Sequence, residues 1–559
     1  MKKNIFGIVA LGLVAGAATV PASGPAPDQV VHVLNRIGFG PRPGDVEKVQ
    51  ALGIERYIDQ QLHPERIPDA GMDPRLRGLK TVTLSSRQIS EQYEQPLLQA
   101  RRARRDAQAA QPSANGAPDD QMLRPRPDGA QQAANAVLIE LSEQKLLRAI
   151  YSERQLQEVL ADFWFNHFNV DARKGRVRFM LTEYEREAIR PHVFGSFRDL
   201  LEATAKSPAM LFYLDNFMSA DPDGSGMGLQ AARPGRAGGR RPGQALLPQG
   251  QLSQAQNRTP RGLNENYGRE LMELHTLGVD GGYTQKDVTE VARAFTGWTI
   301  GNPREMLGML DRVDRVDRVN RTARGGAAAI GRPSGFFFNP RLHDDGEKVV
   351  LGHKIKSGGG VGDGEQVLDL LAAHPATARF IATKLSRRFV SDTPAAALVD
   401  RVAARFMATS GDLREVMRTL LLSPEFLAPE TTRAKVKTPF EFLVSALRAT
   451  AASVSSARPL IRTMQDLGMP LYQCQPPTGY KDTADAWAST GALVNRMNVA
   501  QALGAGQLAG TTVNTAETHT TLEALLPGLS DTTRATMARA TNEAERLALT
   551  LGSPEFQRR

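Results

Sequence analysis

The densest cluster of residue types that can do chemistry lies on one predicted helix. Glu270 and Glu273 are three positions apart, and Asn266 precedes Glu270 by four, so a helix places all three on one face. Two neighbouring carboxylates can bind a divalent cation with ligands from elsewhere, or act as general acid and base. The alternative is a solvated, ion-paired surface, because Arg269 stands among these acids and Glu265.

His275 follows the acids on the same predicted helix. At about 100° per residue, an ideal helix places His275 beside Leu271 and away from Glu273. Glu270, Glu273 and His275 therefore cannot all converge on one metal ion from an ideal helix. We expect a packed or hydrogen-bonded histidine at position 275.

Two further polar clusters could complete a site with the acid pair. Asn166 and His167 stand among aromatic residues at a helix end, and His343 with Asp344 lies in a loop. His167 is a candidate catalytic histidine, whereas the alternative is an aromatic core in which Asn166 and His167 are satisfied by the backbone. His343 and Asp344 can ligate a metal or relay a proton, and a polar turn explains them equally well.

The elements that must position these residues are mainly helices. Apolar residues recur at helical spacing over 136–168, and residues 264–298 form two predicted helices joined by a glycine-rich turn. Thr284 with Asp287 predicts a capping box at the start of the second helix. Strand signals are sparse, and residues 336–338 and 348–351 predict one β-hairpin around a loop containing Asp345 and Gly346.

The expected fold class is therefore mainly α, a multi-helix globular protein with a helical hairpin at its centre, one small β-hairpin and disordered insertions. We expect a main helical domain over residues 28–430 and a C-terminal helical region over 435–559. Segments near 101–132, 220–261 and 311–335 are rich in arginine and poor in large apolar residues, so we expect mobile insertions there. The alternative is that they tether the protein to an acidic polymer or surface.

The first residues indicate export. Residues 1–22 combine Lys2 and Lys3, an apolar core over 5–18 and a small-residue cleavage site, which is the pattern of a secretory signal peptide. We expect a periplasmic or extracellular protein with no membrane span after cleavage. An uncleaved anchor is the alternative, although the apolar core is short for a bilayer.

Composition and motifs argue against several familiar classes of protein, but not against a site assembled from distant residues. The net charge of +9 lies largely in the predicted insertions, so no folded nucleic-acid-binding face is expected. The single cysteine, Cys474, cannot form an internal disulfide. The sequence contains no paired-histidine zinc helix, paired-cysteine metal knuckle, phosphate loop ending in Gly-Lys-Ser/Thr or Gly-x-Ser-x-Gly elbow.

Several motifs resemble those of one bacterial family. They lie at residues 163–168, 264–279, 282–285 and 296–298, and at His343-Asp344 before Gly346 and Lys348. On these motifs the chain is similar, over about residues 31–556, to the family named domain of unknown function 1800. It departs from the family at Gly268, where alanine is more usual. The resemblance implies a set of candidate binding residues, namely Asn166, Asn264, Glu265, Asn266, Arg269, His275, Tyr283, Trp298, His343 and Asp344.

The resemblance implies a large, exported helical protein, often encoded beside a protein resembling sulfatases and alkaline phosphatases, and it carries over no activity. We therefore expect a binding or assembly component that acts with an exported partner, which that sulfatase- or phosphatase-like protein could be. The alternative is an extracytoplasmic hydrolase with Glu270, Glu273 and His167 as catalytic residues, with or without a divalent cation as cofactor.

Overall fold

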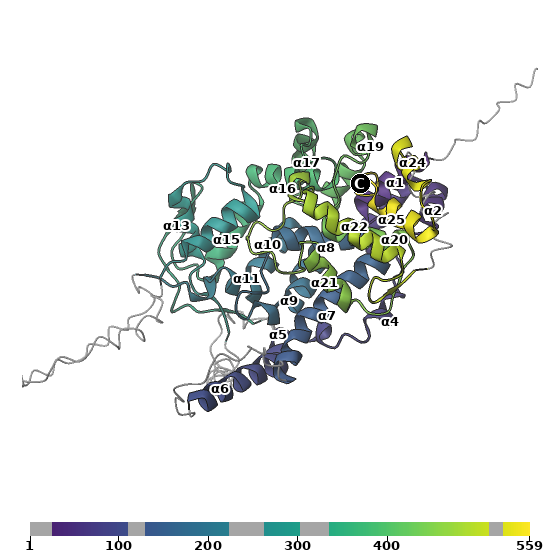
Figure 1. Ribbon diagram of the computed structural model, residues 1–559. Helices are drawn as coiled ribbons and strands as arrows, with labels where there is room; N and C mark the ends of the chain where they lie inside the picture. Colours follow the sequence, from purple (N-terminus) through teal and green to yellow (C-terminus); the bar gives the residue numbers. More distant parts are fainter. Residues whose placement is uncertain (1–24, 110–128, 223–261, 302–334, 514–528) are drawn as a thin grey trace, which may run out of the picture.

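The computed structural model describes residues 25–109, 129–222, 262–301, 335–513 and 529–559 (Figure 1). The predicted signal peptide and most of the three predicted insertions lie outside the described residues. The described ends of the first expected insertion are helical, because α6 runs to Ala109 and α7 begins at Gly129.

The described chain is mainly helical, as predicted. The helices before residue 222 are α1 (Pro27–Ile37), α2 (Asp45–Leu52), α3 (Ile54–Leu62), α4 (Met72–Leu76), α5 (Ser86–Ile89), α6 (Gln95–Ala109), α7 (Gly129–Tyr151), α8 (Gln155–His167), α9 (Leu181–Glu183), α10 (Phe197–Ala205) and α11 (Pro208–Tyr213). The predicted helical hairpin consists of α12 (Glu265–Glu270), the π-helix η8 (Leu271–Thr276) and α13 (Gln285–Ala294). The later helices are α15 (Val361–Ala372), α16 (Pro375–Phe389), α17 (Ala396–Ala408), α18 (Leu413–Leu421), α19 (Pro424–Leu427), α20 (Pro439–Ala449), α21 (Arg458–Asp466), α22 (Thr490–Gly504), α24 (Asp531–Met537) and α25 (Glu543–Gly552).

Local sequence explains where several of these helices begin. Thr284 and Asp287 form the predicted capping box at the start of α13, and Thr438 and Glu441 form another at the start of α20. In each box the threonine hydroxyl accepts from the backbone of the acidic residue, whose carboxylate accepts from the threonine backbone. These contacts satisfy backbone donors that a helix start otherwise leaves unpaired.

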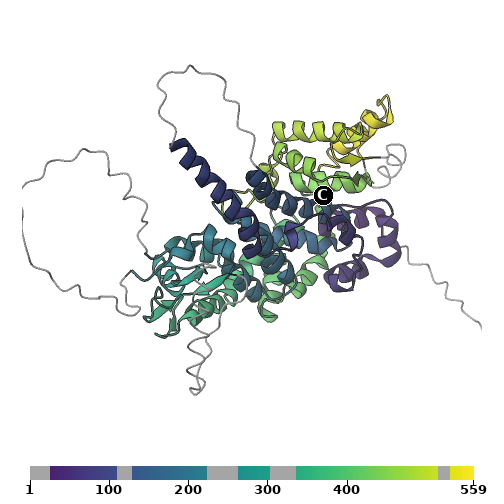
Figure 2. The same ribbon diagram turned by 90° about the horizontal axis from the view of Figure 1, so that it is seen from below.

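The helices pack around one large apolar core. Its buried residues run from Val30 in α1 to Phe556 after α25, and they include Phe440 and Leu447 of α20. The boundary that the sequence suggests near residue 430 therefore falls within a continuous core. α8 lies near the middle of the molecule, with α13 and α15 toward one end and α24 and α25 toward the other (Figures 1 and 2). α6 projects from the body in both views.

The predicted β-hairpin is wrong in its pairing. Among the described residues, β2 (Phe336–Phe338) pairs antiparallel with β1 (Trp298–Ile300), whereas β3 (Lys348–Val350) pairs with β4 (His353–Ile355). β3 and β4 are joined by Leu351 and Gly352, both at positive φ, which suits a tight two-residue hairpin turn. In a third strand pair, β5 (Ser453–Val454), which follows α20, pairs antiparallel with β6 (Thr511–Thr512), which follows α22.

The chain segments described by the structure include no helix that is both long and apolar enough to cross a membrane.

Candidate functional site

Asn264 anchors the start of the helical hairpin. Its side-chain oxygen accepts from the Tyr267 backbone N–H at 3.2 Å and thereby caps α12. Its side-chain nitrogen donates to the carbonyl of Leu214 at 2.7 Å, and its backbone N–H donates to the Ser219 hydroxyl at 3.2 Å. The two ends of the long segment that separates α11 from the hairpin therefore meet, and Asn264 has a structural role in joining them.

The π-helix η8 changes which residues share a face. The Leu277 N–H donates to the Met272 carbonyl five residues back, and the Thr276 hydroxyl donates to the Leu271 carbonyl at 2.8 Å. A π-helix turns less per residue than an α-helix, so the projection of an ideal helix is wrong beyond Leu271. His275 is buried against Phe168, with ring centroids 5.1 Å apart, as expected for a packed histidine.

The outer face of the hairpin ties its two helices together. Glu265 accepts from Gln285 and from Thr289, both at 2.9 Å, and Arg269 donates to Gln285 at 2.6 Å. Within the described hairpin, Arg269 makes no ion pair with the acids around it. The alternative of an ion-paired surface is therefore not what forms here, because Glu265 and Arg269 make hydrogen bonds to side chains of α13 instead. Asn266 is exposed on this face.

The acid pair lies partly buried on the same hairpin. Glu273 accepts from the Tyr283 hydroxyl at 3.2 Å. The Glu270 side chain forms no hydrogen bond or ion pair with any described residue. Burial raises the pKa of Glu270, and the neighbouring Glu273 carboxylate raises it further. Glu270 is therefore a carboxyl group that takes up a proton more readily than usual.

His167 lies at the end of α8 and joins three elements. Its Nε2 lies 3.1 Å from the His275 carbonyl of η8, and its Nδ1 lies 2.8 Å from the Nζ of Lys384 in α16. A carbonyl oxygen only accepts, so Nε2 carries the proton and Nδ1 accepts from Lys384. Burial lowers the pKa of His167 well below its usual value, and the Lys384 charge lowers it further, so the ring is neutral.

Lys384 and Arg387 line a cavity of about 380 Å³ beside His167. Its charged lining residues are the cations Lys145, Lys384, Arg387, Arg388 and Lys481 and the carboxylates Asp162 and Asp482. Asp162 neutralises Lys145 at 2.6 Å, and Arg388 is paired with Glu441 at 2.6 Å. Asp482 is shared by the buried cations Arg388, Lys435 and Arg559 at 3.5–3.8 Å. Lys384 and Arg387 form no ion pair with any described carboxylate, and Lys481 is exposed, so the cavity is a cationic recess.

Asn166 and Asn169 hold the other wall of this cavity. Asn166 donates to the Tyr480 carbonyl at 2.8 Å and accepts from the Tyr480 N–H at 2.7 Å. Asn169 donates to the carbonyls of Cys474 and Pro476 at 2.9 and 2.8 Å. Gly479 must lack a side chain, because a Cβ there would lie 2.3 Å from the Asn166 carbonyl oxygen. Asn166 therefore positions the 474–480 segment instead of facing a ligand.

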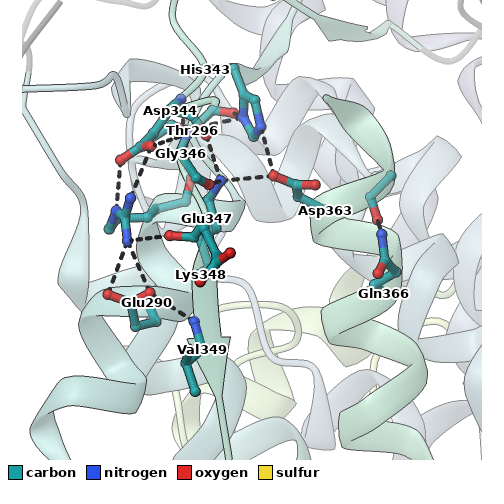
Figure 3. Close-up of polar contacts among 12 residues, drawn as sticks. Glu290, Thr296, His343, Asp344, Gly346, Glu347, Lys348, Val349, Asp363 and Gln366 are labelled. Atoms are coloured by element: carbon teal, nitrogen blue, oxygen red, sulfur yellow. Dashed lines mark hydrogen bonds and ion pairs between the residues drawn. The ribbon is translucent and has the colours of Figure 1, made fainter. Parts of the chain in front are cut away.

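His343 belongs to a separate, fully buried network (Figure 3). Its Nδ1 lies 2.8 Å from the Thr296 carbonyl and its Nε2 lies 3.2 Å from the Asp363 carboxylate. Lys348 donates to the same Asp363 oxygen at 2.7 Å. Burial acts to raise the pKa of Asp363, but the hydrogen bonds from His343 and Lys348 outweigh it and hold that pKa below its usual value. With every member at most 1% exposed in its side chain, this network braces β3 against α15.

Asp344 and Trp298 complete the same region. Asp344 accepts two hydrogen bonds from Arg293 of α13, at 2.7 and 3.1 Å, and one from the Gly346 N–H at 2.9 Å (Figure 3). These contacts bind the 343–346 loop to α13, which explains why it does not turn the predicted hairpin. Trp298 is wholly buried, with its ring over Gly364, where an added Cβ would lie 2.5 Å from the indole.

The family comparison confirms the family that the sequence motifs resemble. The family model described as "Protein of unknown function (DUF1800)" matches residues 32–558. The chain belongs to the DUF1800 family. No curated protein and no solved structure matches the chain.

In this DUF1800 chain the motif residues form two centres instead of one. His167 and His275 meet beside the cationic cavity, and His343 and Asp344 belong to the buried network. The residues lining the cavity include His167 but neither Glu270 nor Glu273. No three His, Cys, Asp or Glu side chains in the described ranges come together in a group suited to a metal ion.

Sequence reasoning did not identify Lys384, Arg387 or Asp363. The signal for the first two was the spacing of Lys384, Arg387 and Arg388 on one helix, which gathers positive charge within a single turn. Nothing in the sequence places that turn beside His167, because 217 residues separate Lys384 from it.

Proposed function

We propose that this DUF1800 protein is an exported binding component whose cavity takes an anionic group, such as a sulfate, phosphate or carboxylate. The observation that carries the proposal is the pair Lys384 and Arg387, two cations in one cavity without a carboxylate partner. Placing cations in a recess is costly unless a counter-charge arrives. A bound anion supplies that charge and accepts charge-assisted hydrogen bonds.

The family context supports the choice of anion and partner. The partner expected from the resemblance is an exported protein of the sulfatase and alkaline phosphatase class, which acts on sulfate or phosphate esters. A cationic cavity suits the charged group of such an ester or its released anion. The rest of the ligand meets the apolar part of the wall, which includes Phe163, Met469 and Leu471.

Binding of inorganic sulfate tests the proposal. Sulfate titrated by calorimetry at constant ionic strength should bind the unmodified protein, and Lys384→Met should weaken binding about 10- to 100-fold, the range for one charge-assisted hydrogen bond. Lys356→Met is the control, because Lys356 is exposed and does not line the cavity. Equal sulfate affinity in all three proteins, or no binding in any of them, would overturn the proposal.

The partner component is tested separately. The mature protein, immobilised through an exposed lysine, should retain a reproducible exported partner from the extracytoplasmic fraction of its host. The same capture with Lys384→Met should lose that partner if the partner presents the anion. Absence of a reproducible partner would leave the anion-binding function and remove the assembly role.

The hydrolase remains a second candidate because of one observation, the partly buried Glu270 with a raised pKa. It requires Glu270, Glu273 and His167 to act on one substrate. A Glu270→Gln variant that hydrolyses phosphate and sulfate esters as well as the unmodified protein does would rule out Glu270 as its acid. Hydrolysis abolished in that variant, with sulfate binding intact, would favour the enzyme.

A further inference from the structure

Within the described residues, the amine of Lys384 makes one hydrogen bond and lies 5.5 Å from the centroid of the Phe380 ring. His167 Nδ1 accepts from the Lys384 Nζ at 2.8 Å, and the His167 tautomer is fixed by the His275 carbonyl on the other side of the ring. No other hydrogen bond to this nitrogen is recorded within the described ranges. The remaining directions of the nitrogen are thus available to a molecule in the cavity that Lys384 lines.

Other lysines of the chain show that this environment is unusual. Lys145 is neutralised by Asp162 at 2.6 Å, and Lys435 by Asp392 at 2.6 Å. Lys437 is buried over the Phe556 ring, 3.9 Å from its centroid, and is not part of the cavity wall. Lys384 combines access from the cavity with the lack of a carboxylate partner.

The groups around Lys384 enlarge the fraction of the amine that is neutral and nucleophilic. Burial and then the charge of Arg387 on the same helix lower the pKa of Lys384, Asp482 on the facing segment acts in the opposite direction, and the net pKa is about 8. His167 of α8 and His275 of η8 also face the amine, and both rings are neutral because burial lowers their pKa values. Roughly one Lys384 side chain in ten is then uncharged at pH 7.

We propose that Lys384 condenses with the carbonyl group of an anionic aldehyde or ketone to form a reversible imine. This inference rests on the proposed function, because Arg387 would hold the anionic group of the same molecule. The nitrogen lone pair attacks the carbonyl carbon, a C–N bond forms, and a proton moves from nitrogen to the former carbonyl oxygen. The second proton of the nitrogen then leaves with that hydroxyl as water, which gives the C=N bond, and no oxidant or reductant is consumed.

Reductive trapping with an aldehyde that carries a phosphate tests the inference. The protein is incubated with pyridoxal 5′-phosphate, reduced with borohydride, digested and mapped by mass spectrometry. We expect the reduced adduct on Lys384, protection by excess sulfate and at least tenfold less adduct with pyridoxal, which lacks the phosphate. Lys437, whose pKa burial lowers to about 7, is an internal control because it does not line the cavity. Lys384→Arg keeps the charge but should abolish the adduct.

The outcomes separate the imine from anion binding. If sulfate still binds in the cavity but labelling spreads over exposed lysines such as Lys356 and spares Lys384, the imine inference is overturned and the proposed function stands. If sulfate neither binds nor protects, both are overturned.

His167 is a positioning residue in this scheme, and its role has a separate readout. In the unmodified protein the trapping rate should rise with pH and level off above about pH 8, where Lys384 is neutral. His167→Asn should lower the plateau several-fold without preventing sulfate binding. An unchanged plateau would show that the contact with His167 does not orient the amine.

Discussion

At the scale of single residues, burial of the Lys384 charge should lower the free energy of unfolding. Its folded pKa, about 8, lies below that of an unfolded lysine, so the unfolded chain binds more protons between about pH 8 and 10.5. The destabilisation is complete below pH 8 and disappears as pH rises toward 10.5. Lys384→Met should therefore raise the unfolding free energy at pH 7 by on the order of 2 kcal/mol, a figure that already allows for the partial exposure of the Lys384 side chain to solvent.

Urea unfolding at pH 7 and at pH 10 measures this difference. The gain in Lys384→Met should be largest at pH 7 and shrink at pH 10. A variant that is less stable than the unmodified protein at pH 7 would contradict the assignment of Lys384 as a costly buried cation.

Two asparagines of the family motifs should differ sharply in their effect on stability. Asn166→Ala removes both hydrogen bonds to the Tyr480 backbone and leaves that backbone without its partners, so we expect a loss of about 1–3 kcal/mol. Asn266→Ala on the exposed face of the hairpin should change stability by less than about 0.5 kcal/mol. Denaturant titration of both variants checks this, and equal losses would refute the structural role of Asn166.

At this scale the sequence predicted the important histidines and asparagines but not their partners. Asn166 and His167 stood out because polar groups among aromatic residues need buried partners, and His343 because a loop histidine beside Asp344 can ligate a metal or relay a proton. Those partners, Lys384 and Asp363, come from other helices, and helical periodicity gives no information about which distant turns meet. The backbone-satisfied alternative was confirmed for Asn166 and holds only in part for His167, which also contacts Lys384.

At the scale of elements, the close contact of α12 with α13 depends on Gly268. A Cβ at this position would lie 2.8 Å from the Val288 carbonyl oxygen and 3.1 Å from the Ala292 nitrogen. Glycine at this position thus lets the two helices approach closely. Gly268→Ala should cost about 1–3 kcal/mol through overpacking, although alanine favours helix intrinsically.

A second glycine serves as the matched control for that change. Gly362 lies within α15, and nothing lies within 4 Å of a Cβ added there. Gly362→Ala should therefore stabilise the protein by roughly 0.5–1 kcal/mol, through helix propensity and reduced freedom of the unfolded chain. Stabilisation by both substitutions in thermal unfolding would show that α12 and α13 can separate at little cost.

Element starts were more predictable than element pairing or helix type. The capping box of Thr284 and Asp287 is a local pattern, and α13 begins where it indicates. The π-helix at Leu271–Thr276 has no comparable local signal, and the strand partners depend on Asp344 binding Arg293. Helix type and strand pairing were therefore set by contacts between residues far apart in the sequence, which the local pattern does not predict.

At the scale of the whole molecule, an ionic cluster links the end of the chain to the core. Glu441 is paired with Arg388 at 2.6 Å and with Arg559 at 3.0 Å, and all three are almost fully buried. Burial acts to raise the pKa of Glu441, but the two guanidinium groups outweigh it and bring that pKa to about 2. The stabilisation from this carboxylate should persist above about pH 4.5 and be lost as pH falls toward 2.

Glu441→Gln should therefore cost about 3–5 kcal/mol, because two buried cations lose their carboxylate. Asp466→Asn, which alters an exposed pair with Arg462, should cost less than about 0.5 kcal/mol.

Since one core runs from α1 to the residues after α25, fluorescence and circular dichroism should show a single coincident transition in denaturant for both variants. Two separated transitions would indicate that residues 435–559 unfold independently.

The helical class was predictable at this scale because helical periodicity and capping recur along the chain. The continuous core across residue 430 was not, since composition marks segment boundaries but not whether the segments pack together. The cavity was equally hidden, because α8, α16 and the 469–483 segment that form it are far apart in the sequence.

The most direct test of the central claim is a crystal structure of the protein soaked with selenate, a sulfate analogue that anomalous scattering locates. Anion binding in the cavity predicts an anomalous peak within hydrogen-bond distance of the Lys384 Nζ and the Arg387 guanidinium, and its absence in Lys384→Met crystals. Selenium found only on exposed arginines, with the cavity empty at a concentration that saturates binding in solution, would contradict the claim.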